Sequence, residues 1–173
     1  MKLLKNQAVA WLLTIVMIAA AIGIGYAKNS RRSPRPGENP SPGAVSYVWD
    51  DAGVLSSRTR QILNERNDRL LNDRDAIIGV ATCNYGRDDL GDYALALADE
   101  MGLGSHDMIV VLDIKGDNYW LLASDDPSRY LSDDDCSDYA WNYMESYFAK
   151  GDYDNAVLSL TEALENWYYN SYR

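Results

Sequence analysis

Five aspartates near the ends of apolar segments are the residues in this sequence whose types and spacing could do chemistry. Asp50 and Asp51 stand side by side before an Ala-Gly-Val-Leu run, Asp107 directly precedes an apolar segment, and Asp125 and Asp126 follow another. Gathered carboxylates raise one another's pKa unless a cation neutralises them, and Ca²⁺ and Mg²⁺ prefer oxygen ligands. The five acids therefore form a candidate site for Ca²⁺, with Mg²⁺ as the alternative.

Each acid also has a plainer interpretation when it is taken alone. An aspartate in front of a helix caps its first N–H groups, and an acid on a surface is solvated. Asp125 and Asp126 are better placed than the others because they leave a predicted strand. Ligand sites in open α/β sheets form at the carboxyl ends of strands.

The sequence lacks the residues that several other common catalytic and binding sites require. His106 is the only histidine, which excludes a histidine-rich zinc site, and no Gly-x-Ser-x-Gly elbow accompanies it for a Ser-His-Asp triad. Cys83 is followed by Arg87, but the segment is shorter than the phosphate loop of cysteine phosphatases, so a structural cysteine is preferred. The sequence has no Walker loop and no Gly-x-Gly-x-x-Gly, and Asp133–Asp135 do not have EF-hand spacing.

The elements that must position these residues follow from hydrophobic periodicity and cap signals. Ser56 or Ser57 is a good N-cap for a first helix, and Gly151 separates the last two helices. The pattern predicts helices over 58–73, 90–101, 134–149 and 152–169, and strands over 76–83, 108–114 and 119–124. This order indicates an α/β sandwich with a small sheet and a C-terminal αα-hairpin.

Thirteen tyrosines are conspicuous, and Tyr139, Tyr143 and Tyr147 fall on one face of a predicted helix. One interpretation is that they are ordinary core and surface aromatics at helical spacing. The other is a binding face for a partner, since tyrosine is enriched where binding energy concentrates. An exposed cluster would favour the second interpretation.

The N-terminal part differs from the rest of the chain. Residues 8–26 carry no charge and are close to the length that spans a bilayer, so residues 1–27 are expected to form a transmembrane anchor. A signal peptide cut after Ala27 is the alternative. Residues 28–43 are rich in Pro, Ser and Arg and read as a solvated tether, and residues 44–173 as the folded domain.

The distribution of charged residues bears on which side of the membrane the domain lies and on which partners it can bind. The basic residues after the apolar segment would keep the domain in the cytoplasm by the positive-inside rule, but almost nothing precedes the segment, so we expect an extracytoplasmic domain. Residues 44–173 carry ten Lys or Arg against twenty-five Asp or Glu, which argues against a nucleic-acid partner. A disulfide between Cys83 and Cys136 is left open.

Several ordered stretches resemble a known family. "VWDDAGVLS", "IIGVATC", "DYALALADEMGLGSHDMIVVLDIKGDNYWLLAS" and "YFAKGDYDNAVLSLTEAL" are similar to the TPM domain, named for thylakoid lumen, photosystem-repair and receptor-modulator proteins. The resemblance runs from about Val48 to Leu164. It implies a three-layer α/β/α sandwich, usually tethered to a membrane outside the cytoplasm. Some relatives are acid phosphatases, some bind Ca²⁺ through acidic loop residues, and others are accessory proteins.

The resemblance places the acid of the first motif on Asp51, with Asp50 beside it, and the polar pair before the strand on His106 and Asp107. Many relatives have Asn-Gly where this chain has Met108-Ile109. We expect Asp51 to share a crevice with Asp107 and with Asp125 or Asp126.

The expected function is that of a membrane-anchored, Ca²⁺-binding module for a partner in the cell envelope. The alternative is a metal-assisted acid phosphatase of low specificity, for which Arg87 and Arg129 are the available phosphate clamps.

Overall fold

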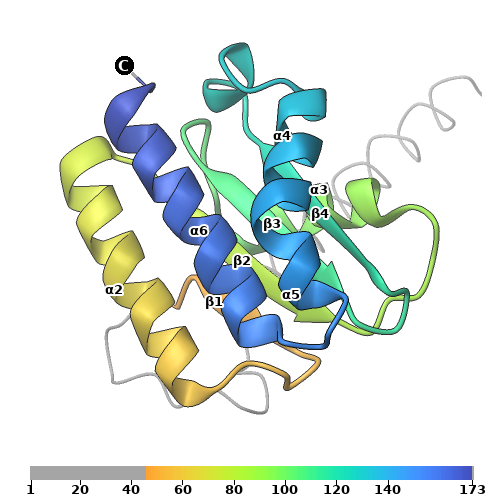
Figure 1. The fold of residues 1–173 in the computed structure, drawn as a ribbon. Coiled ribbons are helices and arrows are strands. Elements are labelled where there is room, and N and C mark those ends of the chain that lie inside the picture. Colours follow the sequence, from red (N-terminus) through yellow and green to blue (C-terminus); the bar gives the residue numbers. More distant parts are fainter. Residues whose placement is uncertain (1–45, 173) are drawn as a thin grey trace, which may run out of the picture. The chain divides into compact units, whose positions relative to one another are not determined.

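The fold is described by a computed structural model, which covers residues 46–172 (Figure 1). The predicted anchor (1–27) and tether (28–43) lie outside the described residues. No helix within residues 46–172 is both long enough and apolar enough to cross a membrane.

One four-stranded sheet lies at the centre of the domain, in the order β1-β2-β3-β4. The strands are β1 (Val48–Asp50), β2 (Ile78–Cys83), β3 (Met108–Asp113) and β4 (Asn118–Ala123). The first three are parallel, and β4 returns antiparallel to β3. Every residue of β2 and β3 is buried, as expected for inner strands covered on both faces. The sequence pattern predicts the last three strands and misses β1, which at three residues is too short to show a periodicity.

The helices lie close to their predicted ranges. They are α2 (Ser57–Arg74), α3 (Leu90–Met101), the 3₁₀ turn η2 (Pro127–Arg129), α4 (Asp133–Ala140), the π-helical turn η3 (Trp141–Glu145), α5 (Ser146–Phe148) and α6 (Tyr153–Asn170). Ser56 caps α2 by accepting a hydrogen bond from the backbone N–H of Thr59. The helix predicted over 134–149 is present but interrupted by η3, which the hydrophobic spacing does not reveal.

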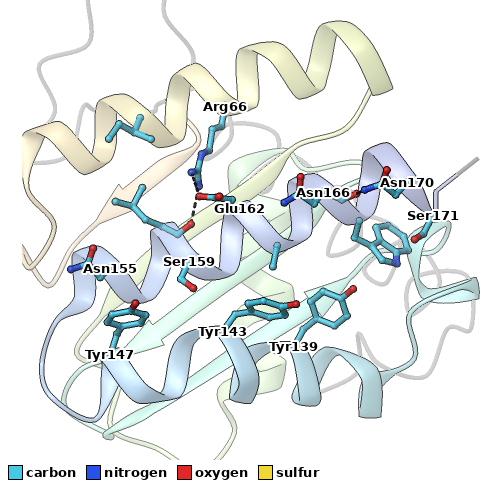
Figure 2. A pocket seen from close by; sticks show the side chains of 14 residues that line it. Arg66, Tyr139, Tyr143, Tyr147, Asn155, Ser159, Glu162, Asn166, Asn170 and Ser171 are labelled. Carbon is cyan, nitrogen blue, oxygen red and sulfur yellow. Dashed lines mark hydrogen bonds and ion pairs between the residues drawn. The ribbon is translucent and has the colours of Figure 1, made fainter.

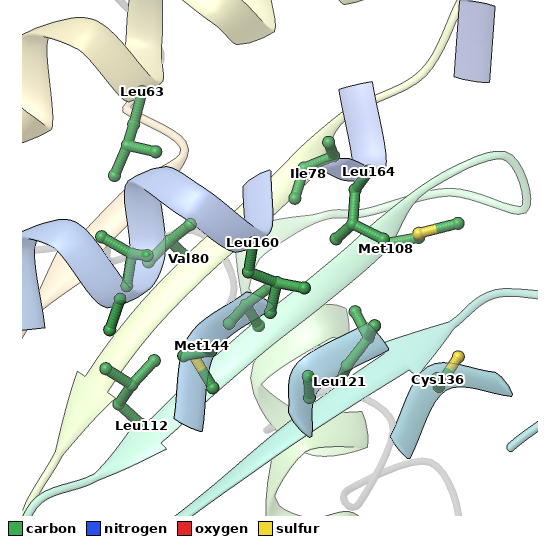
Figure 3. Close-up of a cluster of buried hydrophobic side chains, with 14 of the residues drawn as sticks. Leu63, Ile78, Val80, Met108, Leu112, Leu121, Cys136, Met144, Leu160 and Leu164 are labelled. Carbon is green, nitrogen blue, oxygen red and sulfur yellow. The ribbon is translucent and has the colours of Figure 1, made fainter. Parts of the chain in front are cut away.

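Two hydrophobic clusters on opposite faces of the sheet produce three layers. Along β3, Met108, Val110 and Leu112 belong to the larger cluster, which they form with α2, α4, α5 and α6. Ile109 and Val111 point to the other face and pack against α3. Figure 3 shows the larger cluster, with Leu63, Met144 and Leu160 arriving from three different helical segments. The predicted α/β fold is confirmed.

The two cysteines are buried as free thiols. Cys83 belongs to the smaller cluster on the α3 face, and Cys136 to the larger cluster on the opposite face. The sheet therefore lies between them, and the disulfide left open by the sequence is not formed in this structure.

Candidate functional site

The predicted acids fall into two groups at opposite ends of the sheet. Asp50 ends β1 level with Thr82 of β2, which in turn is level with Leu112 of β3. Asp107 directly precedes β3, five residues before Leu112, which corresponds to about 16 Å along a strand. The acids that follow β4 lie at this second end, because Ala123 pairs with Met108. The single crevice expected from the sequence is therefore corrected to two separate acidic ends.

Asp50 holds the loop that follows β1. Its side chain is 3% exposed and forms a 3.4 Å ion pair with Arg60. Its oxygens also accept hydrogen bonds from the N–H groups of Val54 (3.0 Å) and Leu55 (3.1 Å) and from the hydroxyl of Thr82 (2.6 Å). The carboxylate is thus committed to protein donors, which fixes the path of the chain into α2.

Asp107 holds the opposite end in the same manner. It is 5% exposed, and its oxygens accept hydrogen bonds from the backbone N–H of Ile77 at 2.8 Å and from that of Gly104. Burial raises the pKa of the Asp107 carboxyl, and the two N–H groups partly offset this. Asp107 joins the start of β2 to the turn that leads into β3.

The two acids after β4 differ from each other. Asp125 is exposed, whereas Asp126 is partly buried and lies 3.2 Å from Arg129 and 3.6 Å from Nδ1 of His106. The same Nδ1 lies 2.6 Å from the hydroxyl of Tyr172. Asp126 therefore belongs to a small polar cluster with His106, Arg129 and Tyr172.

These acids do not fit one shared calcium centre. Within residues 46–172 there is no group of three or more His, Cys, Asp or Glu side chains that could hold a metal ion. The oxygens of Asp50 and Asp107 already accept backbone hydrogen bonds. Asp51 and Asp125 are exposed, and cation binding by either of them stays a prediction.

Asp113 is a further buried carboxylate with a structural role, and the sequence-based predictions do not include it. It is 0% exposed and accepts hydrogen bonds from the N–H groups of Tyr85 (2.9 Å), Gly86 (2.6 Å) and Gly116 (3.1 Å). It thereby ties the β2–α3 loop to the β3–β4 turn. Its position as the last residue of a buried strand is the signal that could have found it.

A groove runs between α6 and the helix formed by α4, η3 and α5, with part of α2 at its edge (Figure 2). Its volume of about 680 Å³ falls in the range of small-molecule sites. The lining residues are Ile62, Arg66, Tyr139, Tyr143, Tyr147, Asn155, Leu158, Ser159, Glu162, Ala163, Asn166, Trp167, Asn170 and Ser171.

The two walls of the groove have different chemistry. One carries Tyr139, Tyr143 and Tyr147 at four-residue intervals, and the rings of Tyr139 and Tyr143 lie with their centroids 5.5 Å apart. Tyr143 and Tyr147 are 44% and 38% exposed. The other wall is α6, which contributes a polar row together with Leu158, Ala163 and Trp167. In Figure 2, Ser159 points toward the tyrosines, whereas Glu162 points toward Arg66. The polar row consists of Asn155, Ser159, Glu162, Asn166 and Asn170.

The π-helical turn η3 explains how the three tyrosines share one face. In an α-helix, four residues exceed a full turn by about 40°, so side chains at this spacing drift around the axis. A π turn closes i→i+5 hydrogen bonds and contains more residues, which counteracts the drift. Met144 in the same turn is 0% exposed and anchors the opposite face in the core. The tyrosine spacing was visible in the sequence, but neither the exposure nor the π turn was.

Charge within the groove is balanced. Arg66 and Glu162 are the charged residues of the lining, and their side chains pair at 2.8 Å. Arg66 also donates to the carbonyl oxygen of Leu158 at 2.8 Å and to the hydroxyl of Thr161 at 3.1 Å. The groove is therefore close to neutral in a domain whose residues 44–173 carry fifteen more acids than bases.

Comparison with known proteins gives one family and several similar folds. The model of the TPM domain matches residues 48–166. The N-terminal domain of a protein from P. gingivalis has a TM-score of 0.68 at 22% identity, covering 75% of this chain and 85% of that chain. The N-terminal domain of the cg2496 protein from Corynebacterium glutamicum has a TM-score of 0.56 at 17% identity, covering 78% and 84%. No curated protein matches the chain.

Proposed function

This chain belongs to the TPM domain family, and from that premise we propose that it is a membrane-tethered binding module whose working surface is the groove between α6 and the α4–α5 helix. The observation that carries the proposal is the groove of about 680 Å³, in which the exposed rings of Tyr143 and Tyr147 and the partly buried ring of Tyr139 form one wall and α6 forms the other. A large pocket with a few convergent polar groups is the default binding site of a domain.

The tyrosine wall is suited to binding because it is both exposed and rigidly mounted. Tyrosine offers a large amphipathic contact area with only two side-chain torsions to order. Met144 and Phe148 are buried on the opposite side of the same helix and hold it against the sheet. A ligand would therefore meet a preformed surface, which lowers the entropic cost of association.

Hydrolysis is the alternative function, and the residues that it would use are less favourably placed. Burial raises the pKa of the Cys83 thiol, and the carboxylates of Asp113 and Asp51 raise it further, which opposes formation of a nucleophilic thiolate. Arg129, one of the two expected phosphate clamps, pairs with Asp126 at the end of the sheet away from Asp50. The groove supports binding more directly than these groups support turnover.

The location belongs to the same proposal. The charge-free segment 8–26 is proposed to anchor the chain in the cell membrane with a single pass, and residues 28–43 to tether an extracytoplasmic domain. The ligand would then lie in the cell envelope. Ca²⁺ binding is kept as a separate proposal for the exposed Asp51.

Site-specific photocrosslinking in the full-length, membrane-embedded chain tests the proposal. A photoreactive phenylalanine is placed at position 143 in the groove, or at position 141 in the same turn. Trp141 is 64% exposed and does not line the groove, so it is the matched control. We expect an adduct from position 143 and none from position 141. No adduct from position 143, or equal adducts from both positions, would overturn the proposal.

Hydrolysis of p-nitrophenyl phosphate, measured with and without CaCl₂, tests the alternative. We expect no turnover above that of the Asp51→Asn variant. Turnover by the wild type that Asp51→Asn abolishes at unchanged circular dichroism would favour the phosphatase.

A further inference from the structure

The chemistry of the two groove walls points to a ligand class, and this inference rests on the proposed function. We propose that the groove binds a neutral oligosaccharide strand, with the sugar rings stacked on Tyr139, Tyr143 and Tyr147 and the hydroxyl or acetamido groups bonded by α6. Four properties of the groove lead to this class of ligand.

The first property is the aromatic wall. The face of an aromatic ring carries partial negative charge, and it attracts the partially positive C–H groups on the flat side of a sugar ring. Tyr139 and Tyr143 lie with ring centroids 5.5 Å apart at an interplanar angle of 36°, so they form a stepped platform and not one flat stack. A chain of linked rings, each slightly rotated from the last, fits such a platform.

The second property is the polar wall. An asparagine amide both donates and accepts hydrogen bonds, as does a serine hydroxyl, and sugar hydroxyls require partners of both kinds. Asn155 uses its Nδ2 to bond Asp152 at 2.7 Å, and Asn170 uses its Nδ2 to bond the carbonyl oxygen of Asn166 at 2.8 Å. Each of these amides is oriented by its donor bond and keeps its Oδ1 as an acceptor toward a ligand.

The third property is charge. Arg66 and Glu162 are the only charged residues that line the groove, and their side chains pair at 2.8 Å. The lining therefore offers no unpaired charge to a charged ligand. The excess of acids over bases in residues 44–173 also repels anionic ligands such as phosphates or acidic peptides. A neutral polymer meets no such penalty.

The fourth property is length. The polar row runs along α6 from Asn155 to Asn170, about 22 Å at the rise of an α-helix. This is long enough for several linked sugar units. A proline-rich peptide also docks on aromatic grooves, but it relies on apolar slots for its rings, whereas the α6 wall presents more polar side chains than apolar ones, the latter being Leu158, Ala163 and Trp167. A saccharide strand would stack on the tyrosines and form hydrogen bonds with the polar side chains of α6, whereas a proline-rich peptide would contact mainly the tyrosines.

Calorimetric titration of the full-length chain in detergent micelles tests this inference. The probes are the hexamer of N-acetylglucosamine, the hexamer of glucose and a decaproline peptide. We expect at least one hexamer to bind and decaproline not to bind. Tyr143→Ala and Tyr147→Ala should each weaken hexamer binding about tenfold, as expected for loss of one stacked ring.

Trp141→Ala is the matched control, because Trp141 is an exposed aromatic of the same turn that lies outside the groove lining. It should leave the affinity within about twofold, which is within the usual spread for a residue that does not contact the ligand. Circular dichroism and thermal unfolding of each variant show that a loss of binding is not a loss of fold.

The outcomes separate this inference from the proposed function. If neither hexamer binds at millimolar concentration, or if Trp141→Ala weakens binding as much as Tyr143→Ala, the saccharide inference is overturned. Binding of decaproline alone overturns it in favour of a peptide. In each case an adduct from position 143 in the crosslinking experiment still supports the binding module, whereas the absence of that adduct removes both proposals.

Discussion

The polar residues at the ends of the sheet and those in the helical groove differ in their exposure to solvent. At the sheet ends, Asp50, Asp107 and Asp113 are withdrawn from solvent, and each accepts two or three hydrogen bonds from the backbone N–H groups of a neighbouring loop or a nearby hydroxyl. In the groove, Tyr143 and Tyr147 remain 44% and 38% exposed on a helix whose other face is buried.

This difference shows that residue type is a weak guide to role without burial. Loops that leave parallel strands present N–H groups that have no strand partner, and a buried carboxylate satisfies two or three of them at once. Asp50 and Asp107, which suggest chemistry in the sequence, thus have structural roles. The tyrosines, whose spacing suggests core packing, supply the exposed surface.

The largest expected effect tests the structural role of Asp113. Asp113→Ala leaves three N–H groups without their acceptor in the β2–α3 loop and the β3–β4 turn. We expect the free energy of unfolding to fall by about 3 kcal/mol or more, since three hydrogen bonds to a buried carboxylate are lost and a hydrogen bond to a charged group contributes about 1.5–3 kcal/mol. Urea unfolding followed by circular dichroism measures it. Asp88→Ala, an exposed acid in the same loop, is the control and should change stability by less than about 0.5 kcal/mol.

Much of the fold was predictable because its long elements carry strong periodic patterns. The fully buried strands β2 and β3 and the amphipathic helices α3 and α6 follow from hydrophobic spacing, and the N-cap Ser56 follows from its capping chemistry. The strand β1 was missed because its position depends on pairing with β2 rather than on any pattern of its own.

The candidate site was less predictable, for two physical reasons. Whether Asp50 and Asp107 share a crevice depends on the direction in which each strand runs, and the antiparallel return of β4 placed Asp125 and Asp126 with Asp107 and away from Asp50. The groove depends on a π turn, in which a local change of hydrogen bonding reorients a whole row of side chains. Neither is encoded in residue spacing.

The second prediction uses two neighbouring acids as a matched pair. Asp50→Ala removes the acceptor of two N–H groups and one hydroxyl, and it leaves Arg60 without this partner. We expect it to lower the free energy of unfolding by about 2–3 kcal/mol. Asp51→Ala, at the exposed neighbour, should change it by less than about 0.5 kcal/mol. Equal losses at the two positions would remove the distinction between buried and exposed acids.

The third prediction concerns the stability of the groove variants. The double variant Tyr143→Ala and Tyr147→Ala should lower the free energy of unfolding by about 1 kcal/mol, because the two residues are partly exposed and the main loss is the ring contact between Tyr139 and Tyr143. Met144→Ala, on the buried face of the same helix, should cost about 2 kcal/mol or more. A loss from the tyrosine pair as large as that from Met144 would mean that the tyrosine wall stabilises the fold, and the contrast with the sheet ends would fail.

The smallest expected effect belongs to Ca²⁺ at Asp51. Because the oxygens of Asp50 and Asp113 are already bonded to protein donors, Asp51 has few neighbouring ligands to share, and we expect an affinity near 1 mM. At 2 mM CaCl₂ such a site stabilises the fold by about 0.6 kcal/mol, measured against NaCl of equal ionic strength. Asp51→Asn should abolish this shift and Asp88→Asn should retain it.

A wild-type shift of zero would make Asp51 an ordinary solvated acid. A shift above about 2 kcal/mol requires an affinity far tighter than one exposed carboxylate provides, so Asp50 or Asp113 would have to exchange its backbone donors for the ion. Because those donors hold the loops after β1 and β2, the second outcome would also predict a change in the near-ultraviolet circular dichroism of Tyr85 on adding Ca²⁺. That signal distinguishes a loop that rearranges around a cation from one that a carboxylate holds fixed.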